Sequence, residues 1–356
     1  MKEKLGVGII GCGNIAGPYA ADLPTYPHLH FVGAADLDPT RAQTLTAQYG
    51  GKAYTDIDQL LRDPDLDLVL NLTTFQAHYE VTAKALQAGK HIFSEKPLAL
   101  TYPKAQELLH LAESKGLRLG CSPFTLMGEA QQTAWKLIRE GRAGQVRMVN
   151  AEVNHGRIEI WHPAPQPFYD VGVVADVGVY PITLLVSMLG PVQRVTSQAK
   201  VLKADRETKE GVSYRIQTPD WWLVLLELGG GITVRLTMNF YVSHLSKQNG
   251  IEFHGDQGSI FLSSSGAFNA AVEFASYGEA YAPVALVRPP YEGIPWGRGA
   301  AEMAEALLAG KPHRFTGELA AHVCEILDAI RASHAQNAPV AVHSGFTPPA
   351  PMAWAL

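Results

Sequence analysis

The chain has 356 residues, of which 47% are hydrophobic and 18% are charged, and its formal net charge is −5. This length exceeds one compact domain of usual size, and the composition is typical of a folded protein with a sizeable core, which excludes a disordered chain. Lysine and arginine are scattered singly along the sequence, which argues against nucleic acid and anionic membrane surfaces as partners.

The cysteines and the amino terminus indicate a cellular compartment. Cys12, Cys121 and Cys324 are odd in number and far apart, so we expect a reducing environment with neither a disulfide framework nor a metal site. We find no signal peptide, twin-arginine motif or transmembrane span, and we therefore expect a cytoplasmic protein.

The first motif is a glycine-rich turn at residues 11–16, directly after the apolar run 5–10. Glycine at position 11 permits a backbone conformation closed to other residues, and Gly13 lets the main chain approach a ligand. Asn14 and Ile15 complete the turn, and Ala16 opens a helix whose N-H groups suit a pyrophosphate. The motif alone is also compatible with a simple turn.

An acidic residue at the end of the next strand strengthens the prediction. Residues 31–35 are apolar and end at Asp36, about twenty residues after Ala16, where a dinucleotide fold places a carboxylate on the adenosine ribose. No lysine or arginine follows Asp36 before Arg41. The Asp36 carboxylate would therefore repel a 2′-phosphate, and no adjacent cation offsets this repulsion. We expect NAD as the cofactor in preference to NADP.

The first 123 residues alternate short apolar runs with amphipathic stretches, the pattern of a parallel sheet wrapped by helices. We expect further strands at 67–72, 90–94 and 118–121, and we count the last as the sixth of a doubly wound sheet. Helices are expected from Pro39 to Gly50, after Asp56, at 77–88 and from Thr101 to Gly116. The segments after strands, at 11–16, 36–41, 73–78, 95–97 and 121–124, should meet at one cleft.

The second half has a different pattern. After a helix at 129–140, alternating runs occur at 145–154, 192–201, 221–228, 232–241, 251–254 and 259–262, with glycine-rich turns at 229–231 and 255–258. These are hairpin signals and predict a mainly antiparallel open sheet in an α+β domain. We therefore expect a dinucleotide-binding domain at 1–123, a substrate-binding and oligomerisation domain at 124–343, and an irregular tail at 344–356. Late helices at 299–309 and 318–336 should pack back on the first domain.

Two short constellations carry polar groups suited to catalysis. Glu95-Lys96-Pro97 follows a strand end that should face the cleft. The alternative to a functional role is an ordinary loop marked by proline, in which the two charged side chains form a solvated ion pair. Asp176 and Tyr180 are four residues apart and share a face if the segment is helical. The alternatives are a helix cap for Asp176 and a core position for Tyr180.

In order and spacing, these motifs resemble the NAD(P)-dependent oxidoreductases of the glucose-fructose oxidoreductase, inositol 2-dehydrogenase and MocA family. The resemblance spans essentially the whole chain and includes Thr73-Thr74 with His78. It implies a catalytic lysine at Lys96 and a substrate-side pair at Asp176 and Tyr180. Many members have histidine at the position of Tyr180. The tyrosine is similar to the branch containing glucose-fructose oxidoreductase, dimeric dihydrodiol dehydrogenase and D-xylose dehydrogenase. Many members also have proline where this chain has Thr74.

The segments that follow the strands and the resemblance to the family together identify the residues of the candidate site. The expected cofactor-binding residues are Gly11, Gly13, Asn14, Ile15, Asp36, Arg41, Thr73, Thr74, His78, Glu95 and Lys96. The expected substrate-binding residues are Lys96, His155, Arg157, Trp161, His162, Asp176 and Tyr180. We include the segment 154–170 as a rim of the substrate pocket because it is rich in hydrogen-bond donors and aromatic rings. An ordinary loop without a role in binding explains this composition equally well.

Three functions fit this site. The first, which we favour, is hydride transfer between nicotinamide and a secondary alcohol or carbonyl of a sugar, polyol or cyclic diol. The second is a redox-neutral enzyme that uses bound NAD transiently, and the third is a nucleotide-binding sensor without turnover. We expect either Tyr180 or Lys96 to exchange the hydroxyl proton. An open antiparallel sheet must hide or solvate one face, so a homodimer or homotetramer is expected.

Overall fold

The computed structural model of the protein describes residues 2–356, and the chain divides into two compact units. The first unit runs to Phe124 and also contains Pro295–Cys324, whereas the second contains Thr125–Ile294 and Glu325–Leu356. The division after Phe124 lies next to the expected boundary at 123. The segment 295–324, which the sequence analysis assigned to the second domain, belongs to the first unit.

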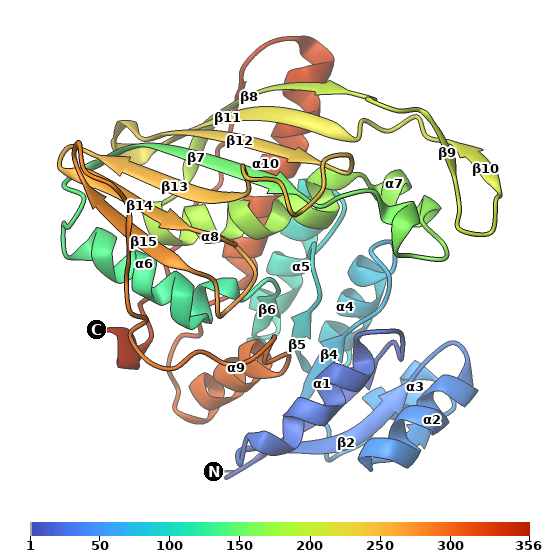
Figure 1. The fold of residues 1–356 in the computed structure, drawn as a ribbon. Helices are drawn as coiled ribbons and strands as arrows, with labels where there is room; N and C mark the ends of the chain where they lie inside the picture. Colours follow the sequence, from blue (N-terminus) through green and yellow to red (C-terminus); the bar gives the residue numbers. More distant parts are fainter. Residues whose placement is uncertain (1) are drawn as a thin grey trace. The chain divides into compact units, whose positions relative to one another are not determined.

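The first unit is built on a parallel six-stranded sheet (Figure 1). The strand order is β3-β2-β1-β4-β5-β6, the order of a doubly wound dinucleotide-binding sheet. The strands are β1 (Leu5–Ile10), β2 (Leu29–Ala35), β3 (Lys52–Tyr54), β4 (Leu68–Asn71), β5 (His91–Ser94) and β6 (Leu119–Cys121). Every residue of β1 and β4 is buried, because helices pack on both faces of such a sheet.

One of these six strands was not delimited from the sequence. The strand β3 has only three residues, and its first two, Lys52 and Ala53, are exposed at the sheet edge. An apolar run of the kind that marks the five other strands is therefore missing. The expected doubly wound fold is confirmed, with β3 as the strand that completes it.

The helices of the first unit begin at the predicted signals. The Asp38 side chain accepts a hydrogen bond from Thr40 N at the start of α2, where Pro39 is the first helical residue, and Asp56 accepts one from Gln59 N at the start of α3. The helices are α1 (Ala16–Asp22), α2 (Pro39–Tyr49), α3 (Ile57–Leu61), α4 (His78–Gln87), α5 (Tyr102–Ser114) and α9 (Arg298–Leu308), with a 3-10 turn at Leu23–Thr25.

The second unit contains a nine-stranded sheet of order β16-β15-β14-β13-β7-β12-β11-β8-β17. Only the β7–β12 pair is parallel, so the expected mainly antiparallel sheet is confirmed. The strands are β7 (Val146–Asn154), β8 (Val192–Lys200), β11 (Trp221–Leu228), β12 (Thr233–Asn239), β13 (Gly250–Gly255), β14 (Gly258–Leu262), β15 (Val272–Ser276), β16 (Ala282–Pro283) and β17 (Val340–Ala341).

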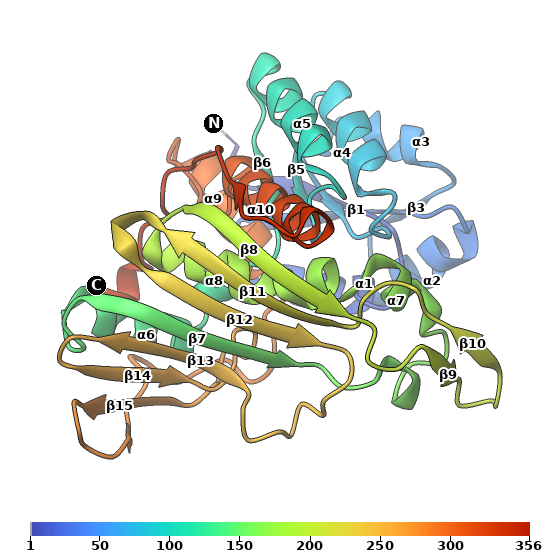
Figure 2. The same ribbon diagram turned by 90° about the horizontal axis from the view of Figure 1, so that it is seen from above.

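The faces of this sheet differ. On β11, Trp222, Val224, Leu226 and Leu228 are buried, whereas Leu225 is 42% exposed on the opposite face. The helices of the unit are α6 (Glu129–Arg139), α7 (Gln166–Val171), α8 (Val179–Leu189) and α10 (Gly317–Gln336), the last of which begins in the first unit. Figure 1 shows α6 and α8 against one face, and in Figure 2 the strands β7, β11, β12 and β13 carry no drawn helix on the face toward the viewer.

Several smaller elements complete the second unit. A separate hairpin of β9 (Asp205–Glu207) and β10 (Ser213–Arg215) projects beyond the ends of β8 and β11 (Figure 2). The residues 344–356 contain one 3-10 turn at Ala353–Ala355, and Arg139 and Gln132 of α6 hold the tail through Ala355 O and Met352 N. The other short turns are Thr125–Met127, Ile158–Ile160, Val174–Gly178 and Gly229–Gly231. No helix among residues 2–356 is both long and apolar enough to cross a membrane.

Candidate functional site

The glycine turn after β1 is fixed by close backbone packing. Gly11 has φ +94°, and a Cβ there would lie 2.8 Å from the Leu72 carbonyl and from Thr73 N. Conformation and space therefore both require glycine at this position. A Cβ on Gly13, by contrast, would have no neighbour within 4 Å. The backbone at Gly13 faces open space, as a close approach by a ligand requires.

The side chain of Asp36 lies over this turn. Its Oδ2 accepts a hydrogen bond from Cys12 N at 2.6 Å, and its Oδ1 accepts one from Asp38 N at 2.9 Å. Burial and the Asp36 carboxylate raise the pKa of the Cys12 thiol to about 12, so this thiol stays protonated at neutral pH. The exposed Arg41 Nε lies 3.7 Å from Asp38 Oδ2. The turn and the carboxylate thus meet at the ends of β1 and β2, whereas Arg41 is paired with Asp38.

His78 joins the loops that follow β4 and β5. Its Nδ1 lies 2.7 Å from Pro97 O and its Nε2 lies 3.1 Å from Thr73 O. Burial lowers the pKa of His78, and a neutral imidazole has one N-H to donate to these two carbonyl oxygens. Both ring nitrogens therefore face the protein's own backbone, and His78 holds the loops after β4 and β5 together. Thr74, in the same loop, is exposed.

Glu95 is a buried carboxylate at the end of β5. Its Oε1 accepts hydrogen bonds from Tyr19 OH at 2.7 Å and Ser122 Oγ at 3.1 Å, and its Oε2 accepts one from Lys96 N at 3.1 Å. These bonds tie α1, β5 and the segment after β6 together around the backbone of Lys96. Tyr19 and Ser122 were not predicted as site residues, because only the fold brings them to Glu95.

Lys96 is only 9% exposed, and its Nζ lies 5.3 Å from the centroid of the Phe75 ring. A lysine ammonium above an aromatic face is held by the ring quadrupole, which restricts a side chain that is otherwise long and mobile. Phe75 lies in the loop after β4, next to Thr73 and Thr74. The first unit therefore presents a positioned ammonium at the carboxyl edge of its sheet.

Asp176 and Tyr180 lie in the second unit on one continuous helical segment. Asp176 is in a π-helical turn, Val174–Gly178, and Tyr180 is in the first turn of α8. The aspartate is 6% exposed and its N-H donates to Gly172 O at 3.1 Å, whereas Tyr180 is partly exposed. π-helical turns are rare and occur often at functional sites. The condition set in the sequence analysis, that the segment be helical, is met, but the wide turn has no local signal in the sequence.

The segment after β7 gathers aromatic side chains. The rings of His155, Trp161, His162 and Phe168 form a chain of edge contacts, with centroids 5.9 Å apart for His155 and Trp161, 5.3 Å for Trp161 and His162, and 4.8 Å for His162 and Phe168. The guanidinium of Arg157 lies 4.7 Å from the Tyr241 ring. The structure thus brings His155, Trp161 and His162 together in one cluster, while Arg157 stacks on a neighbouring strand end.

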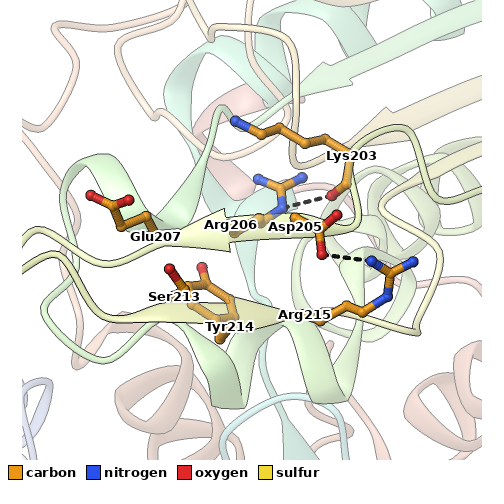
Figure 3. Close-up of a pocket in the computed structure, with 7 residues that line it drawn as sticks. All are labelled: Lys203, Asp205, Arg206, Glu207, Ser213, Tyr214 and Arg215. Atoms are coloured by element: carbon orange, nitrogen blue, oxygen red, sulfur yellow. Dashed lines mark hydrogen bonds and ion pairs between the residues drawn. The ribbon is translucent and has the colours of Figure 1, made fainter.

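This aromatic segment is anchored by the β9–β10 hairpin. Arg206 is fully buried and pairs with Glu159 and with Asp220, and its Nη1 donates to Tyr169 OH at 2.6 Å. Figure 3 shows an open depression on the hairpin, where Arg206 also donates to Lys203 O. The depression has a volume of about 460 Å³ and is lined by Lys203, Asp205, Arg206, Glu207, Ser213, Tyr214 and Arg215. None of the predicted site residues lines it.

Taken by residue type, the first unit offers a nucleotide-binding turn and a fixed ammonium, and the second offers a buried carboxylate, a phenol and an aromatic cluster. In the second unit the carboxylate and the aromatic cluster suit orientation of a polyhydroxy ligand, and the phenol of that unit and the ammonium of the first are each of a type that can exchange a proton. Among residues 2–356, no three His, Cys, Asp or Glu side chains are grouped as a metal site requires.

Family models match both halves of the chain. An oxidoreductase family with an NAD-binding Rossmann fold, GFO_IDH_MocA, matches residues 5–122, and the GFO/IDH/MocA C-terminal domain matches residues 131–261. Among curated relatives, an uncharacterized oxidoreductase of Schizosaccharomyces pombe is 31% identical over 184 residues, which cover 51% of this chain and 49% of the relative. The match therefore spans about half the length of that relative.

Two further similarities extend over more of the chain. The 1,5-anhydro-D-fructose reductase of Ensifer adhaerens is 26% identical over 261 residues, which cover 71% of this chain and 74% of the relative. The solved structure of levoglucosan dehydrogenase with NADH and L-sorbose has a TM-score of 0.82 and 20% identity, and the superposition covers 96% of this chain and 99% of that one. At 20% identity, the similarity to levoglucosan dehydrogenase is a similarity of fold.

Proposed function

The chain belongs to the GFO/IDH/MocA family of NAD-binding oxidoreductases, and on this premise we propose that it transfers a hydride between nicotinamide and a sugar, polyol or cyclic diol. The reacting group is a secondary alcohol or its carbonyl. The observation that carries the proposal is the open backbone at Gly13 beside the fixed carboxylate of Asp36. The name of the curated relative, 1,5-anhydro-D-fructose reductase, supports the carbohydrate class.

The residues present fit a dinucleotide. A pyrophosphate suits the turn at Gly11, Gly13, Asn14 and Ile15, and the ribose hydroxyls suit Asp36. We propose NAD as the preferred form, because Asp36 would repel a 2′-phosphate and Arg41 is paired with Asp38. The bound nicotinamide supplies or accepts the hydride.

We propose that Lys96, Asp176 and Tyr180 act on one substrate. The hydroxyl proton must leave when a carbinol is oxidised, and it must return when a carbonyl is reduced. In our proposal Tyr180 exchanges this proton, Lys96 hydrogen-bonds the same oxygen, and Asp176 orients the substrate or the lysine. The rival assignment gives the proton to Lys96 and leaves Tyr180 as a positioning donor.

The aromatic cluster and Arg157 are proposed as the rim of the substrate pocket. Aromatic faces pack against the C-H faces of sugar rings, and histidine and arginine supply hydrogen-bond donors. We further propose that two or more copies associate through the uncovered face of the nine-stranded sheet.

Absorbance of reduced nicotinamide tests the proposal directly. The purified protein is mixed with NAD⁺ or NADH and with D-xylose, D-glucose, myo-inositol, levoglucosan or 1,5-anhydro-D-fructose. A change in absorbance that depends on one of these compounds is expected. Release of a leaving group from a glycoside without net change would instead select the redox-neutral function, and nucleotide binding without any conversion would select the sensor.

A further inference from the structure

The loop between β14 and β15 passes beside the ring of Tyr180. A Cβ built on Gly266, in the middle of this loop, would lie 3.9 Å from Tyr180 Cδ1. We propose that residue 266 determines the size of the substrate group admitted beside Tyr180. This inference rests on the proposed role of Tyr180 and adds a specificity-determining position to it.

The loop has a fixed position. Gln131 on α6 is fully buried, and its Nε2 donates to Ser264 O at 3.1 Å and to Ala267 O at 2.9 Å. Ser264 Oγ accepts hydrogen bonds from Gly266 N at 3.2 Å and Ala267 N at 3.1 Å. In addition, Ala130 N donates to Phe268 O at 3.1 Å. Because both sides of Gly266 are held, a side chain placed there would project in a defined direction.

Nothing in the protein itself requires glycine at position 266. Its φ lies outside the left-handed region, and the distance of 3.9 Å to Tyr180 is ordinary van der Waals contact, with no closer atom around the added Cβ. Gly128, the N-cap residue of α6, provides the contrast, because a Cβ there would lie 2.0 Å from Gln131 Oε1 and 2.9 Å from Phe268. The missing side chain at 266 therefore leaves space beside a partly exposed phenol.

This space has a consequence for selectivity. A larger residue at 266 would extend along the Tyr180 ring and occupy the volume through which a substrate substituent must pass. The phenolic oxygen itself would remain, so a small substrate keeps its contact with Tyr180. The glycine therefore admits sugars with a substituent next to the reacting carbinol, and a side chain at 266 would exclude them.

The test uses D-xylose and D-glucose, which differ by one hydroxymethyl group, with the wild-type protein and the variants Gly266→Ala and Gly266→Leu. We expect Gly266→Leu to lower kcat/KM for D-glucose by about tenfold or more relative to D-xylose, the range that one carbon unit produces in a tight pocket. Gly266→Ala should give a smaller change of the same sign. Gly229→Leu is the matched control, because that glycine also has an unstrained φ and a Cβ there would meet only Gln193 Nε2, at 3.8 Å.

A second measurement tests the contact between residue 266 and Tyr180 in the absence of substrate. Tetranitromethane nitrates exposed tyrosine rings, and peptide mass spectrometry gives the rate at Tyr180. Gly266→Leu should slow nitration of Tyr180, and Gly229→Leu should leave it unchanged. Wild-type selectivity in Gly266→Leu, or an unchanged nitration rate, would overturn the inference while the proposed function stands. Failure of the wild-type protein to convert any sugar of the panel would contradict the proposed function instead.

Discussion

Nη1 of Arg206 lies 2.8 Å from Oε1 of Glu159, and the side chains are 0% and 9% exposed. Arg206 belongs to the β9–β10 hairpin and Glu159 to the turn within the aromatic segment, so this ion pair joins two parts of the second unit. A buried charge is costly unless it is paired and hydrogen-bonded. Asp220, Tyr169 and the Lys203 carbonyl are further partners of Arg206, so this one side chain ties the hairpin to the rest of the second unit.

Removing the cation should therefore destabilise the protein strongly. Arg206→Met leaves two buried carboxylates without their partner, and we expect a loss of about 3–5 kcal/mol in the free energy of unfolding. Arg215→Met is the matched control on the same hairpin, since the Arg215–Asp205 pair is 66% and 80% exposed and should cost about 1 kcal/mol or less. Urea unfolding of both variants measures the difference. Similar small losses of unfolding free energy in both variants would show that the Arg206 ion pairs do not hold the hairpin in place.

The same pair predicts a pH dependence. Burial alone would raise the pKa of Glu159, but the hydrogen bond from Tyr169 and the charge of Arg206 hold it below its ordinary value of 4.5. A lowered pKa adds stability above the unfolded-state value, and this contribution disappears as the pH falls through the folded-state value. The stability difference between the wild type and Glu159→Gln should therefore shrink below about pH 4. Urea unfolding at neutral and acidic pH measures it, and a constant difference would contradict the argument.

The sequence was sufficient where local signals and burial agree. The turn at Gly11, the helix start at Asp56 and the apolar strands of the first unit each have a short-range cause, and they appear where expected. The strand β3 was not delimited because its exposure removes the apolar pattern. The π-helical turn at Asp176 was missed because no residue pattern distinguishes it from the start of an α-helix.

The β9–β10 hairpin shows what the sequence cannot supply. Residues 205–215 are mostly charged or polar and no strand was predicted for them, yet the hairpin carries a fully buried Arg206. The partners of Arg206 are 47 residues earlier and 14 residues later in the chain. Likewise, His155 meets the Phe240 ring at 5.7 Å because β7 and β12 pair in parallel with Asn154 opposite Asn239. Such contacts depend on strand register and not on local sequence.

Cofactor preference should depend on the charge of Asp36. Asp36→Asn retains an oxygen to accept the Cys12 N-H but removes the repulsion of a 2′-phosphate. We expect the ratio of kcat/KM for NADH to that for NADPH to fall by about tenfold, equivalent to about 1.4 kcal/mol. Asp56→Asn is the control, because it changes a carboxylate that caps the next helix, α3, and leaves the Arg41–Asp38 pair in place. A wild-type preference for NADPH would overturn the assignment.

Self-association should depend on the uncovered sheet face. Leu225 and Met148 are 42% and 43% exposed, and the strand register places them on the same face of β11 and β7. Light scattering at micromolar concentration should show a dimer or larger species, and Leu225→Lys should shift it toward the monomer by placing a charge in the contact. Leu202→Lys, which changes a residue 44% exposed outside the sheet, should have no effect. A monomeric wild type would exclude the proposal.

The identity of the proton-exchanging residue can be resolved with two variants. Both assignments require Lys96, whose ammonium lies over Phe75 at the end of β5, so Lys96→Met should lower turnover by about a hundredfold or more. Binding of NADH should persist, because the glycine turn and Asp36 remain intact. Quenching of protein fluorescence by NADH provides this control, and loss of binding would show that the lysine substitution disturbs the first unit as a whole.

Tyr180→Phe then separates the two assignments, because it removes only the phenolic hydroxyl from a partly exposed ring. A loss of turnover as large as that of Lys96→Met identifies Tyr180 as the acid and base, since its proton is needed only in the transition state. Near-normal kcat with a raised KM transfers that role to Lys96 and leaves the tyrosine as a binding donor. Wild-type turnover in both variants would show that the reacting carbinol binds elsewhere.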